Sequence, residues 1–310
     1  MASTSSGEST PAEGLAVSRA FAAVAVSARP PQWVKNLVVA LPFLFGAALS
    51  SPRGWWLAAA GVVVFCAVAS GIYVVNDVVD RERDRAHPVK RLRPLASGQL
   101  AVTTALSAAV VLEGGGLLAA FLLDANFGRW CAIYAALMLA YSALLKKIPF
   151  LEALIVASGM PLRALAGSAL AGVRPSMFLM ICAYLLALFL VVAKRQWEFH
   201  HAGRESSADH RPALAAYRAE GLDYLFVVTA LTTVAAYAAY SVAPPTIARY
   251  GRSLAPTVPF VVLGIARYVR LVYRRGGGGN PTQALLTDDP WLLAIVVGWV
   301  AAAGWIIYGR

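Results

Sequence analysis

Long apolar segments, separated by short polar connections, recur along the whole chain. A helix needs about 20 residues to cross the roughly 30 Å hydrocarbon core of a bilayer. Because backbone polar groups must be satisfied inside lipid, such segments are expected to be helical. The pattern predicts nine membrane-spanning helices, near residues 34–51, 55–79, 101–123, 127–146, 149–173, 177–195, 222–243, 254–273 and 290–308. The first is short, and Pro42 interrupts it.

Composition supports this interpretation. Hydrophobic residues make up 59% of the 310 residues and charged residues only 14%, and the mean hydropathy is +0.64. These values lie far from those of soluble domains. The sequence therefore predicts an all-α integral membrane protein. We expect residues 1–28 to form a disordered or interfacial tail, and residues 29–310 to form a single nine-helix membrane domain.

Basic residues fall mainly in alternate loops, which predicts the orientation in the cell membrane. The richer set lies between spans two and three and after spans four and six: Arg81, Arg83, Arg85, Lys90, Arg91, Arg93, Lys146, Lys147, Lys194, Arg195, Arg204, Arg211 and Arg218. The other loops hold only Arg53, Arg129, Arg174, Arg249 and Arg252. By the positive-inside rule the richer set is cytoplasmic, with the N-terminus inside and the C-terminus outside.

Three aspartates stand at the end of the second predicted span, in the segment NDVVDRERD. On a continuous helix, Asp77, Asp80 and Asp84 share one face, with Asn76 one turn before Asp80. A solvated, charge-balanced helix is one interpretation of such a run. A magnesium–phosphate site is favoured, because the acids begin where the membrane ends and Asn76 adds another oxygen ligand.

Basic side chains at the same membrane level could neutralise phosphate oxygens. They are Lys90, Arg91 and Arg93 after the acids, Lys146 and Lys147 with Tyr141 after span four, and Lys194 with Arg195 after span six. Each cluster alone is expected from the positive-inside rule, because basic residues gather at cytoplasmic helix ends. Together, the clusters suggest one polyphosphate pocket. Arg163 lies inside span five, where a charge is a functional candidate unless it snorkels to the interface.

The segment NDVVDRERD fits the NDxxDxxxD signature and resembles the UbiA superfamily of membrane prenyltransferases. The segments RPPQWVKN, YVVNDVVDRERDRAHPVKRLRP, YSALLKK, LRALAG and VVAKRQWE are similar to one branch of it, the decaprenyl-phosphate phosphoribosyltransferases. That branch makes the lipid precursor of actinobacterial cell-wall arabinan. The similar segments run from residue 29 to about residue 198.

The resemblance implies a helical bundle around a central cavity that opens to the cytoplasm. It implies 5-phosphoribosyl 1-diphosphate as donor, decaprenyl or another polyprenyl phosphate as acceptor, and Mg²⁺ as cofactor. The transfer would invert the anomeric centre and give decaprenylphosphoryl-β-5-phosphoribose. Membrane lipids are expected partners and nucleic acid is not, and the chain is a candidate homo-oligomer.

The site residues expected from motif and resemblance fall into three groups. The metal ligands are Asn76, Asp77, Asp80 and Asp84. The catalytic residues are Asp77, Asp80, Asp84 and Lys35. The substrate-binding residues are Asn36, Lys90, Arg91, Arg93, Tyr141, Lys146, Arg163, Lys194 and Arg195.

One departure from the superfamily pattern leaves alternatives open. Most relatives carry a second aspartate motif after span six, whereas here that loop opens with Lys194, Arg195 and Glu198. Glu205 and Asp209 could form a degenerate second motif, which would favour an aromatic or quinone-pathway prenyltransferase. A membrane transporter is the non-enzyme alternative. It explains the many spans but not the acids beside a basic loop.

Overall fold

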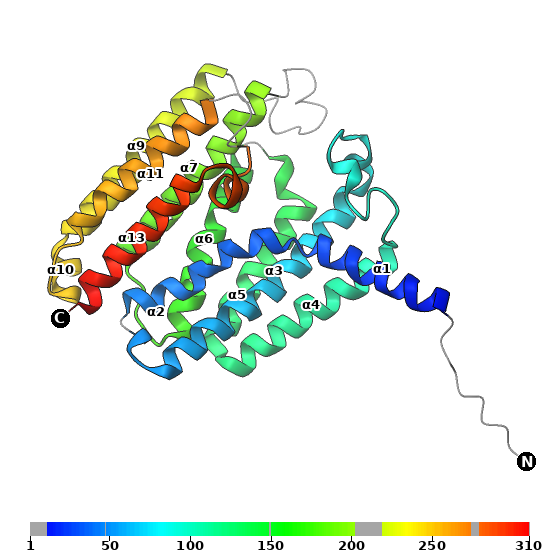
Figure 1. Cartoon of the computed structure of the whole chain (residues 1–310), viewed down its shortest axis with the longest axis horizontal. Coiled ribbons are helices and arrows are strands. Elements are labelled where there is room, and N and C mark those ends of the chain that lie inside the picture. Colours follow the sequence, from blue (N-terminus) through cyan, green and yellow to red (C-terminus); the bar gives the residue numbers. More distant parts are fainter. Residues whose placement is uncertain (1–10, 47, 149, 202–218, 274–278, 310) are drawn as a thin grey trace, which may run out of the picture.

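A computed structural model describes residues 11–46, 48–148, 150–201, 219–273 and 279–309. Helices make up nearly all of this part of the chain, and it contains no β-strand (Figure 1). The longest helices lie side by side in a bundle. The all-α prediction is therefore confirmed for the described residues.

The elements follow one another with short connections. In chain order they are α1 (Pro11–Ser27), η1 (Pro30–Ala40), α2 (Leu41–Phe45), η2 (Ala48–Ser50), α3 (Pro52–Ala86), η3 (Lys90–Leu92), α4 (Val102–Leu123), α5 (Ala125–Ala143), η4 (Leu145–Lys147), α6 (Leu151–Leu170), α7 (Met177–His201), α9 (Ala219–Val242), α10 (Pro244–Tyr250), η6 (Ala255–Thr257), α11 (Val258–Tyr273), α12 (Pro281–Gln283), η7 (Ala284–Asp288) and α13 (Pro290–Tyr308). The η elements are 3₁₀ helices, except η7, which is a π-helix.

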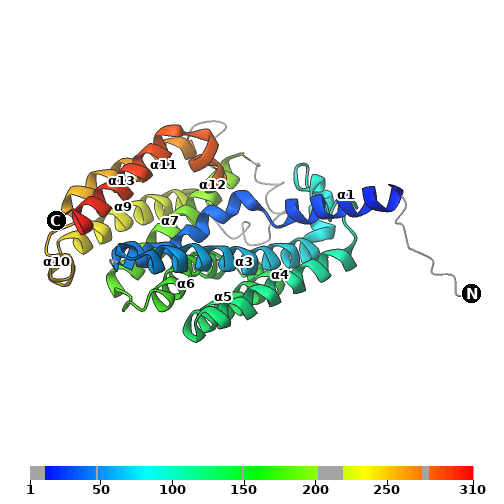
Figure 2. The same cartoon turned by 60° about the horizontal axis from the view of Figure 1, so that its bottom comes forward.

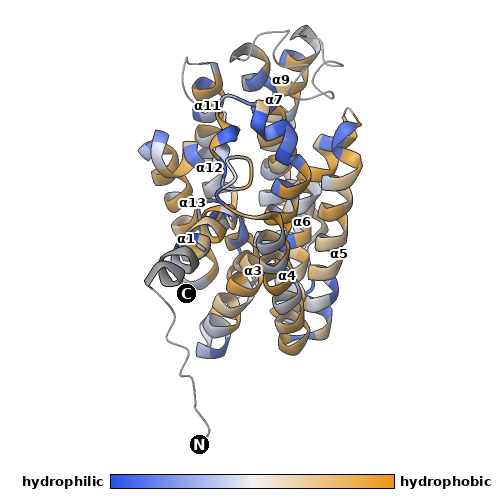
Figure 3. Ribbon diagram, turned by 90° about the vertical axis from the view of Figure 1, so that its right-hand side faces the viewer, coloured by the Kyte–Doolittle hydropathy of each residue, from blue (hydrophilic) through white to orange (hydrophobic). Residues whose placement is uncertain are grey.

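Seven helices in the described part are long and apolar enough to cross a membrane: α3, α4, α6, α7, α9, α11 and α13. Figure 3 shows apolar residues along these helices and polar residues gathered toward their ends. The predicted span at 34–51 is not one continuous helix: it is divided among η1, which begins earlier at Pro30, α2, which has Pro42 in its first turn, and η2. Helix α5 occupies the predicted span at 127–146 but is not among the seven. The chain is thus a multi-pass membrane protein, and the count of nine spans stays a prediction.

Local sequence explains where several helices begin. Ser51 caps α3 by accepting a hydrogen bond from the amide of Gly54 at 3.2 Å, and Pro52 follows at the first helical position. Asp124 caps α5 through the amide of Phe127 at 2.8 Å. Polar oxygen caps satisfy amides that lack a partner in the first turn, and proline has no such amide to satisfy. These caps set short, sharp turns between neighbouring helices.

The core is divided between two groups of helices. In the first, α3, α5, α6 and η1 pack around Phe65 and Tyr134, whose ring centroids lie 4.8 Å apart. In the second, α7, α9 and α11 pack around Phe189 and Phe226, whose rings stack at 5.4 Å. Side chains of α2, α7, α9 and α13 join the groups through a third cluster. Helix α1 extends beyond the bundle and contacts α3 and α4 (Figures 1 and 2).

The antiparallel order of the helices brings distant parts of the sequence to one end of the bundle. Helices α3, α5 and α7 finish there, and α4, α6 and α9 begin there. We call this the motif end, because it holds the NDVVDRERD segment. The other end carries the α6–α7 connection, α10 and the end of α13.

The 3₁₀ helix η1 packs closely against α6 because of a glycine. A Cβ atom at Gly167 would come within 2.1 Å of the carbonyl oxygen of Val39. Trp33 Nε1 donates to Ser70 Oγ at 3.1 Å, which ties η1 to α3 as well. The position of η1 therefore depends on a backbone contact that only glycine permits.

Replacing this glycine tests the packing of η1. Gly167→Ala should lower the free energy of unfolding by about 1–3 kcal/mol, because η1 or α6 must move to admit the methyl group. Thermal unfolding of the detergent-purified protein would measure the change. Gly115→Ala is the matched control: no atom lies within 4 Å of a Cβ at Gly115, so that variant should be as stable as the wild type or slightly more stable. Equal stability of Gly167→Ala and wild type would contradict the close contact.

Candidate functional site

The three aspartates of the motif lie on the last turns of α3, where the helix reaches the motif end. Asp77 and Asp84 are 3% and 4% exposed, and the side chain of Asp80 is 17% exposed. Their spacing along a continuous helix places them on one face, as the sequence predicts. Burying carboxylates is costly unless cations or hydrogen-bond donors compensate the charge.

Arg93 compensates two of the three aspartates. Its Nη1 donates to Asp77 Oδ1 at 3.0 Å and to Asp84 Oδ2 at 2.6 Å. A single cationic nitrogen thus stands between two carboxylates that lie on the same face of α3, two turns apart. The loop that carries Arg93 is itself held by α3, because Arg81 Nε and Arg85 Nε donate to the carbonyl oxygens of Leu95 and Ala96.

The remaining aspartate, Asp80, pairs with a lysine from a different element, η4. Lys146, in η4, places Nζ 2.7 Å from Asp80 Oδ1, and Arg83 lies 3.5 Å from the same oxygen. Lys146 is 8% exposed, so this ion pair is largely shielded from water. It fixes the end of α5 against the end of α3.

Arg29 is a site residue that the sequence interpretation missed. Its Nη2 forms a hydrogen bond and an ion pair with Asp77 Oδ1, and its guanidinium lies over the ring of Tyr73 at 5.2 Å. Arg29 also has φ 56° and ψ 59°, a left-handed conformation that non-glycine residues rarely adopt. Only the following Pro30, which restricts the preceding residue, hinted at an unusual backbone there.

A second missed residue, Glu152, organises the ends of α5, α6 and α7. It is fully buried, and Arg195 donates to both of its carboxylate oxygens, from Nε at 2.6 Å and Nη2 at 2.8 Å. Tyr141 OH donates to Glu152 Oε2 at 3.4 Å, and Arg195 Nη1 donates to Glu198 Oε2 at 2.8 Å. Glu152 therefore brings together the predicted substrate-binding residues Tyr141 and Arg195. The sequence interpretation missed Glu152 because it lies within an apolar segment.

Arg163 is held inside the bundle by three different elements. Its Nε donates to Asn36 Oδ1 at 2.8 Å, its Nη1 to the carbonyl oxygen of Gly159 at 2.7 Å, and its Nη2 to Tyr134 OH at 2.7 Å. It therefore does not snorkel to the interface: it is 6% exposed and ties η1 to α5 and α6. Its predicted contact with substrate stays a prediction, as does that of Asn36.

Lys35 stands among cations. Electrostatic repulsion from Lys194, Arg163 and Arg29 acts on its ammonium group. Several positive charges kept close together in a partly buried region form a site that favours an anion. The remaining predicted residues lie nearby in sequence: Lys90 and Arg91 in η3, on the loop of Arg93, and Asn76 beside Asp77 on α3. Glu205 and Asp209 lie outside the described residues.

The fit of this site to a divalent metal can be judged from its donors. Within the described ranges, no three Asp, Glu, His or Cys side chains gather closely enough to hold a metal ion. Asp77 and Asp84 nevertheless converge on one cationic nitrogen, that of Arg93. Mg²⁺ binds through one or two carboxylates and completes its shell with water and phosphate oxygens. The donor set fits such a two-carboxylate ion.

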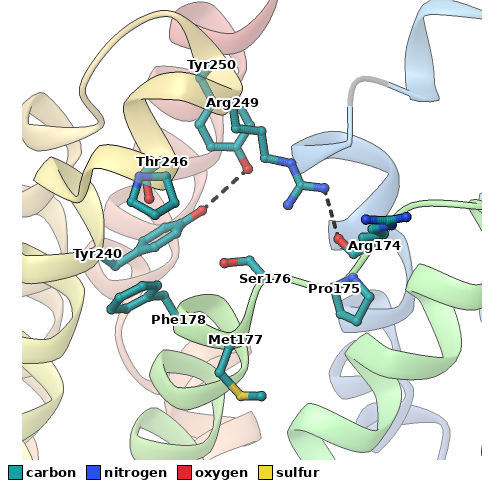
Figure 4. A pocket seen from close by; sticks show the side chains of 10 residues that line it. Arg174, Pro175, Ser176, Met177, Phe178, Tyr240, Thr246, Arg249 and Tyr250 are labelled. Carbon is teal, nitrogen blue, oxygen red and sulfur yellow. Dashed lines mark hydrogen bonds between the residues drawn. The ribbon is translucent and has the colours of Figure 1, made fainter.

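Two pockets stand out at opposite ends of the bundle. The larger, about 760 Å³, is a groove between α1, η1, α12 and η7, and Arg29 is one of its lining residues. The smaller, about 240 Å³, lies at the end away from the motif, between the start of α7, the end of α9, and α10. Figure 4 shows Arg249 reaching the carbonyl oxygen of Arg174 beside this smaller pocket, at 2.9 Å. It contains none of the predicted site residues.

Comparisons with known proteins agree with the motif. A family model described as the UbiA prenyltransferase family matches residues 37–285. The chain belongs to the UbiA prenyltransferase family. The resemblance seen in NDVVDRERD is thereby confirmed, and the fold of this UbiA family member agrees: a solved UbiA homolog from Archaeoglobus fulgidus, bound to GPP and Mg²⁺, superposes with a TM-score of 0.71 at 18% identity, covering 92% of this chain and 99% of that one.

Curated relatives of this UbiA family member are similar over nearly their full length. A decaprenyl-phosphate phosphoribosyltransferase from Corynebacterium glutamicum is 35% identical, over 90% of this chain and 85% of the relative. Proteins of the same name from Mycolicibacterium smegmatis and Mycobacterium tuberculosis are each 32% identical, over 90% and 91% of this chain and 91% and 93% of the relatives.

The buried pair of Glu152 and Arg195 generates a stability prediction for this UbiA family member. Glu152→Ala should lower the free energy of unfolding by roughly 3–5 kcal/mol, because it leaves the Arg195 guanidinium buried without its main partner. Chemical unfolding in detergent micelles would measure the loss. Replacing both residues with methionine should recover much of the stability, since no charge is then left buried. Glu82→Ala, at an exposed acid, serves as control. A loss no larger than that of Glu82→Ala would show that the pair is not structurally important.

Proposed function

We propose that the chain transfers the 5-phosphoribosyl group from 5-phosphoribosyl 1-diphosphate to decaprenyl phosphate or another polyprenyl phosphate. The observation that carries the proposal is the similarity to decaprenyl-phosphate phosphoribosyltransferases over about 90% of the chain, at 35% identity to the protein from C. glutamicum. The motif end supports it, because it combines buried carboxylates with several cations. The protein is then a transferase of the cell membrane, with this end facing the cytoplasm.

Asp77 and Asp84, with Asp80 and Asn76 beside them, are the proposed ligands of Mg²⁺. When bound there, Mg²⁺ supplies charge neutralisation for the diphosphate leaving group. Arg93 and Lys146 now compensate the same carboxylates. Their cationic groups become available to phosphate oxygens of the donor once the carboxylates have another counter-ion, and arginine can bind such oxygens through its planar fork.

In the proposed chemistry the protein positions two anionic substrates and supplies no nucleophile of its own. A phosphate oxygen of the acceptor forms a bond to C1 of the ribosyl group, while the bond from C1 to the diphosphate oxygen breaks and diphosphate leaves. Attack from the opposite face inverts C1 and gives decaprenylphosphoryl-β-5-phosphoribose, a precursor for arabinan. The acceptor phosphate is already anionic near neutral pH, so no strong base is needed. Positioning and electrostatic stabilisation account for the rate.

The cations around the acids are the proposed anion-binding groups. Lys35, Lys194 and the loop of Lys90, Arg91 and Arg93 are assigned to the donor's phosphates. Tyr141 and Arg195 are arranged around Glu152 and form the wall beside them. Arg163 and Asn36 bind each other, which favours a role in holding η1 in place next to the substrates.

The groove between α1, η1, α12 and η7 is the proposed place for the polyprenyl chain. Val26, Pro30, Pro31 and Leu286 give it apolar walls, and its volume of about 760 Å³ suits part of a long chain rather than the whole of it. The rest of such a chain would remain in the bilayer. Polar side chains such as Gln32 and Thr282 share the lining, and a combination of apolar walls with polar groups is typical of ligand sites.

Turnover by an Asp77 variant tests the proposal. Asp77→Asn should lower the rate about 100-fold or more, because the charge that holds the metal and stabilises the leaving group is lost. The assay follows label from phosphoribosyl diphosphate into the lipid phase, with purified protein, decaprenyl phosphate, and Mg²⁺ present or removed by chelation. Glu82→Gln, an exposed acid within the same motif, should transfer label at the wild-type rate.

The alternatives have distinct outcomes in this assay. Consumption of a prenyl diphosphate with an aromatic acceptor, and no transfer of label, would replace the proposal by a prenyltransferase activity. Substrate uptake into vesicles without chemical conversion would indicate a transporter. Full activity of Asp77→Asn would refute the role of the motif even if the wild type transfers label.

A further inference from the structure

Arg29 occupies the joint between α1 and η1, where the chain changes direction. Helix α1 ends at Ser27, and η1 begins with Pro30 and Pro31. The left-handed backbone of Arg29 is unusual for a residue with a side chain, and more so before proline. Outliers of this kind persist where the surrounding structure requires them, and they cluster at ligand sites.

Arg29 lies between two features of the protein, the acidic motif of α3 and the groove beside α1. On one side it binds the carboxylate of Asp77, the first acid of the motif. On the other, Arg29 is one of the residues that line the groove between α1, η1, α12 and η7. Among the described residues that line this groove, Arg29 is the one with a charge; the others are apolar or carry amide or hydroxyl groups. Arg29 is therefore the lining residue that can form an ion pair with the charged end of an anionic lipid.

We propose that Arg29 exchanges partners during the reaction: it pairs with Asp77 when the metal site is empty, and it binds the acceptor's phosphate once metal and donor are in place. This inference rests on the proposed function. Asp77 Oδ1 accepts from both Arg29 and Arg93, so a metal ion at Asp77 competes with both arginines. When Arg29 is displaced, it is left near Lys35 and other cations, where an anion is favoured.

The partner exchange makes binding of the two substrates cooperative. Metal and diphosphate at the acids release Arg29 toward the groove, so the lipid phosphate binds more tightly after them. Thermodynamic linkage requires the converse, that bound lipid phosphate increases the affinity for metal and diphosphate. A residue that merely held α1 and η1 in place would not produce this coupling.

Equilibrium binding of radiolabelled decaprenyl phosphate to the full-length protein in lipid nanodiscs tests the inference. Affinity is measured with and without Mg²⁺ plus inorganic diphosphate, for wild type, Arg29→Gln, Arg29→Lys and the control Arg53→Gln. Arg53 is exposed and starts α3 at the opposite end of the bundle. Wild type and Arg53→Gln should bind the lipid about 10-fold more tightly when Mg²⁺ and diphosphate are present, a coupling of ordinary size. Arg29→Gln should show no such increase, and Arg29→Lys a reduced one.

Binding of Mn²⁺ as a magnesium substitute, followed by electron paramagnetic resonance without any substrate, gives an independent measure. Arg29→Gln should bind Mn²⁺ several-fold more tightly than wild type, because a competing cation has been removed from Asp77. Arg29→Lys should retain much of the competition. Elution at the wild-type volume in gel filtration would show that the variants are folded. If Arg29→Gln does not fold, Arg29→Lys still tests the inference.

The outcomes separate the inference from the function on which it rests. If wild type transfers label and Arg29→Gln keeps the full coupling, the partner exchange is wrong and the function stands. If wild type neither binds decaprenyl phosphate nor transfers label, the proposed function and the acceptor role of Arg29 both fail. Unchanged Mn²⁺ affinity in both Arg29 variants would overturn the competition at Asp77. Lipid binding that inorganic phosphate displaces equally well in wild type and Arg29→Gln would also overturn the assignment.

Discussion

Two buried carboxylates impose the main constraint on this protein. Asp77 and Asp84 lie at the end of a long apolar helix, where an uncompensated charge would cost several kcal/mol. The chain meets this cost with cations from two separate places, Arg29 at the α1–η1 joint and Arg93 in the loop after α3, and Lys146 of η4 pairs with the neighbouring Asp80. These ion pairs bring the ends of α1, α3 and α5 together, so the same charges that form the site also assemble the motif end.

The buried ion pair of Glu152 and Arg195 extends the network of charges across the bundle. Glu152 begins α6 and Arg195 is near the end of α7, so their bidentate contact links the helices on either side of the α6–α7 hairpin. Arg163 continues the connection inward, from α6 to η1 and α5. An opening motion at the motif end would therefore have to break charge-assisted hydrogen bonds. The opposite end instead combines aromatic contacts, such as Phe45 against Trp299, with hydrogen bonds such as that from Trp299 Nε1 to Tyr237 OH.

What the sequence could predict followed from local patterns. Apolar length gave the seven long helices, and helical spacing gave the shared face of Asp77, Asp80 and Asp84. The same reasoning could not find Glu152 or Arg29, because each acts through a partner 43 or 48 residues away. It also expected one helix at 34–51. Prolines and the close contact of Val39 with Gly167 shape η1 instead, and that contact exists only in the folded bundle.

The short sequence distance between the acids and Arg93 also bears on how the protein is made. Asp77 and Arg93 are 16 residues apart, and Asp84 and Arg93 are 9 apart, on one helix and the loop that follows it. Arg93 can therefore pair with both acids as soon as α3 and this loop have left the ribosome, before α5 and α6 have been synthesised, and Arg29, the second partner of Asp77, precedes them in the chain. Lys146 is 66 residues from Asp80 and arrives later. A nascent chain can thus insert α3 with its two most deeply buried acids already paired with arginines, whereas Asp80 gains its partner Lys146 later, during assembly of the bundle.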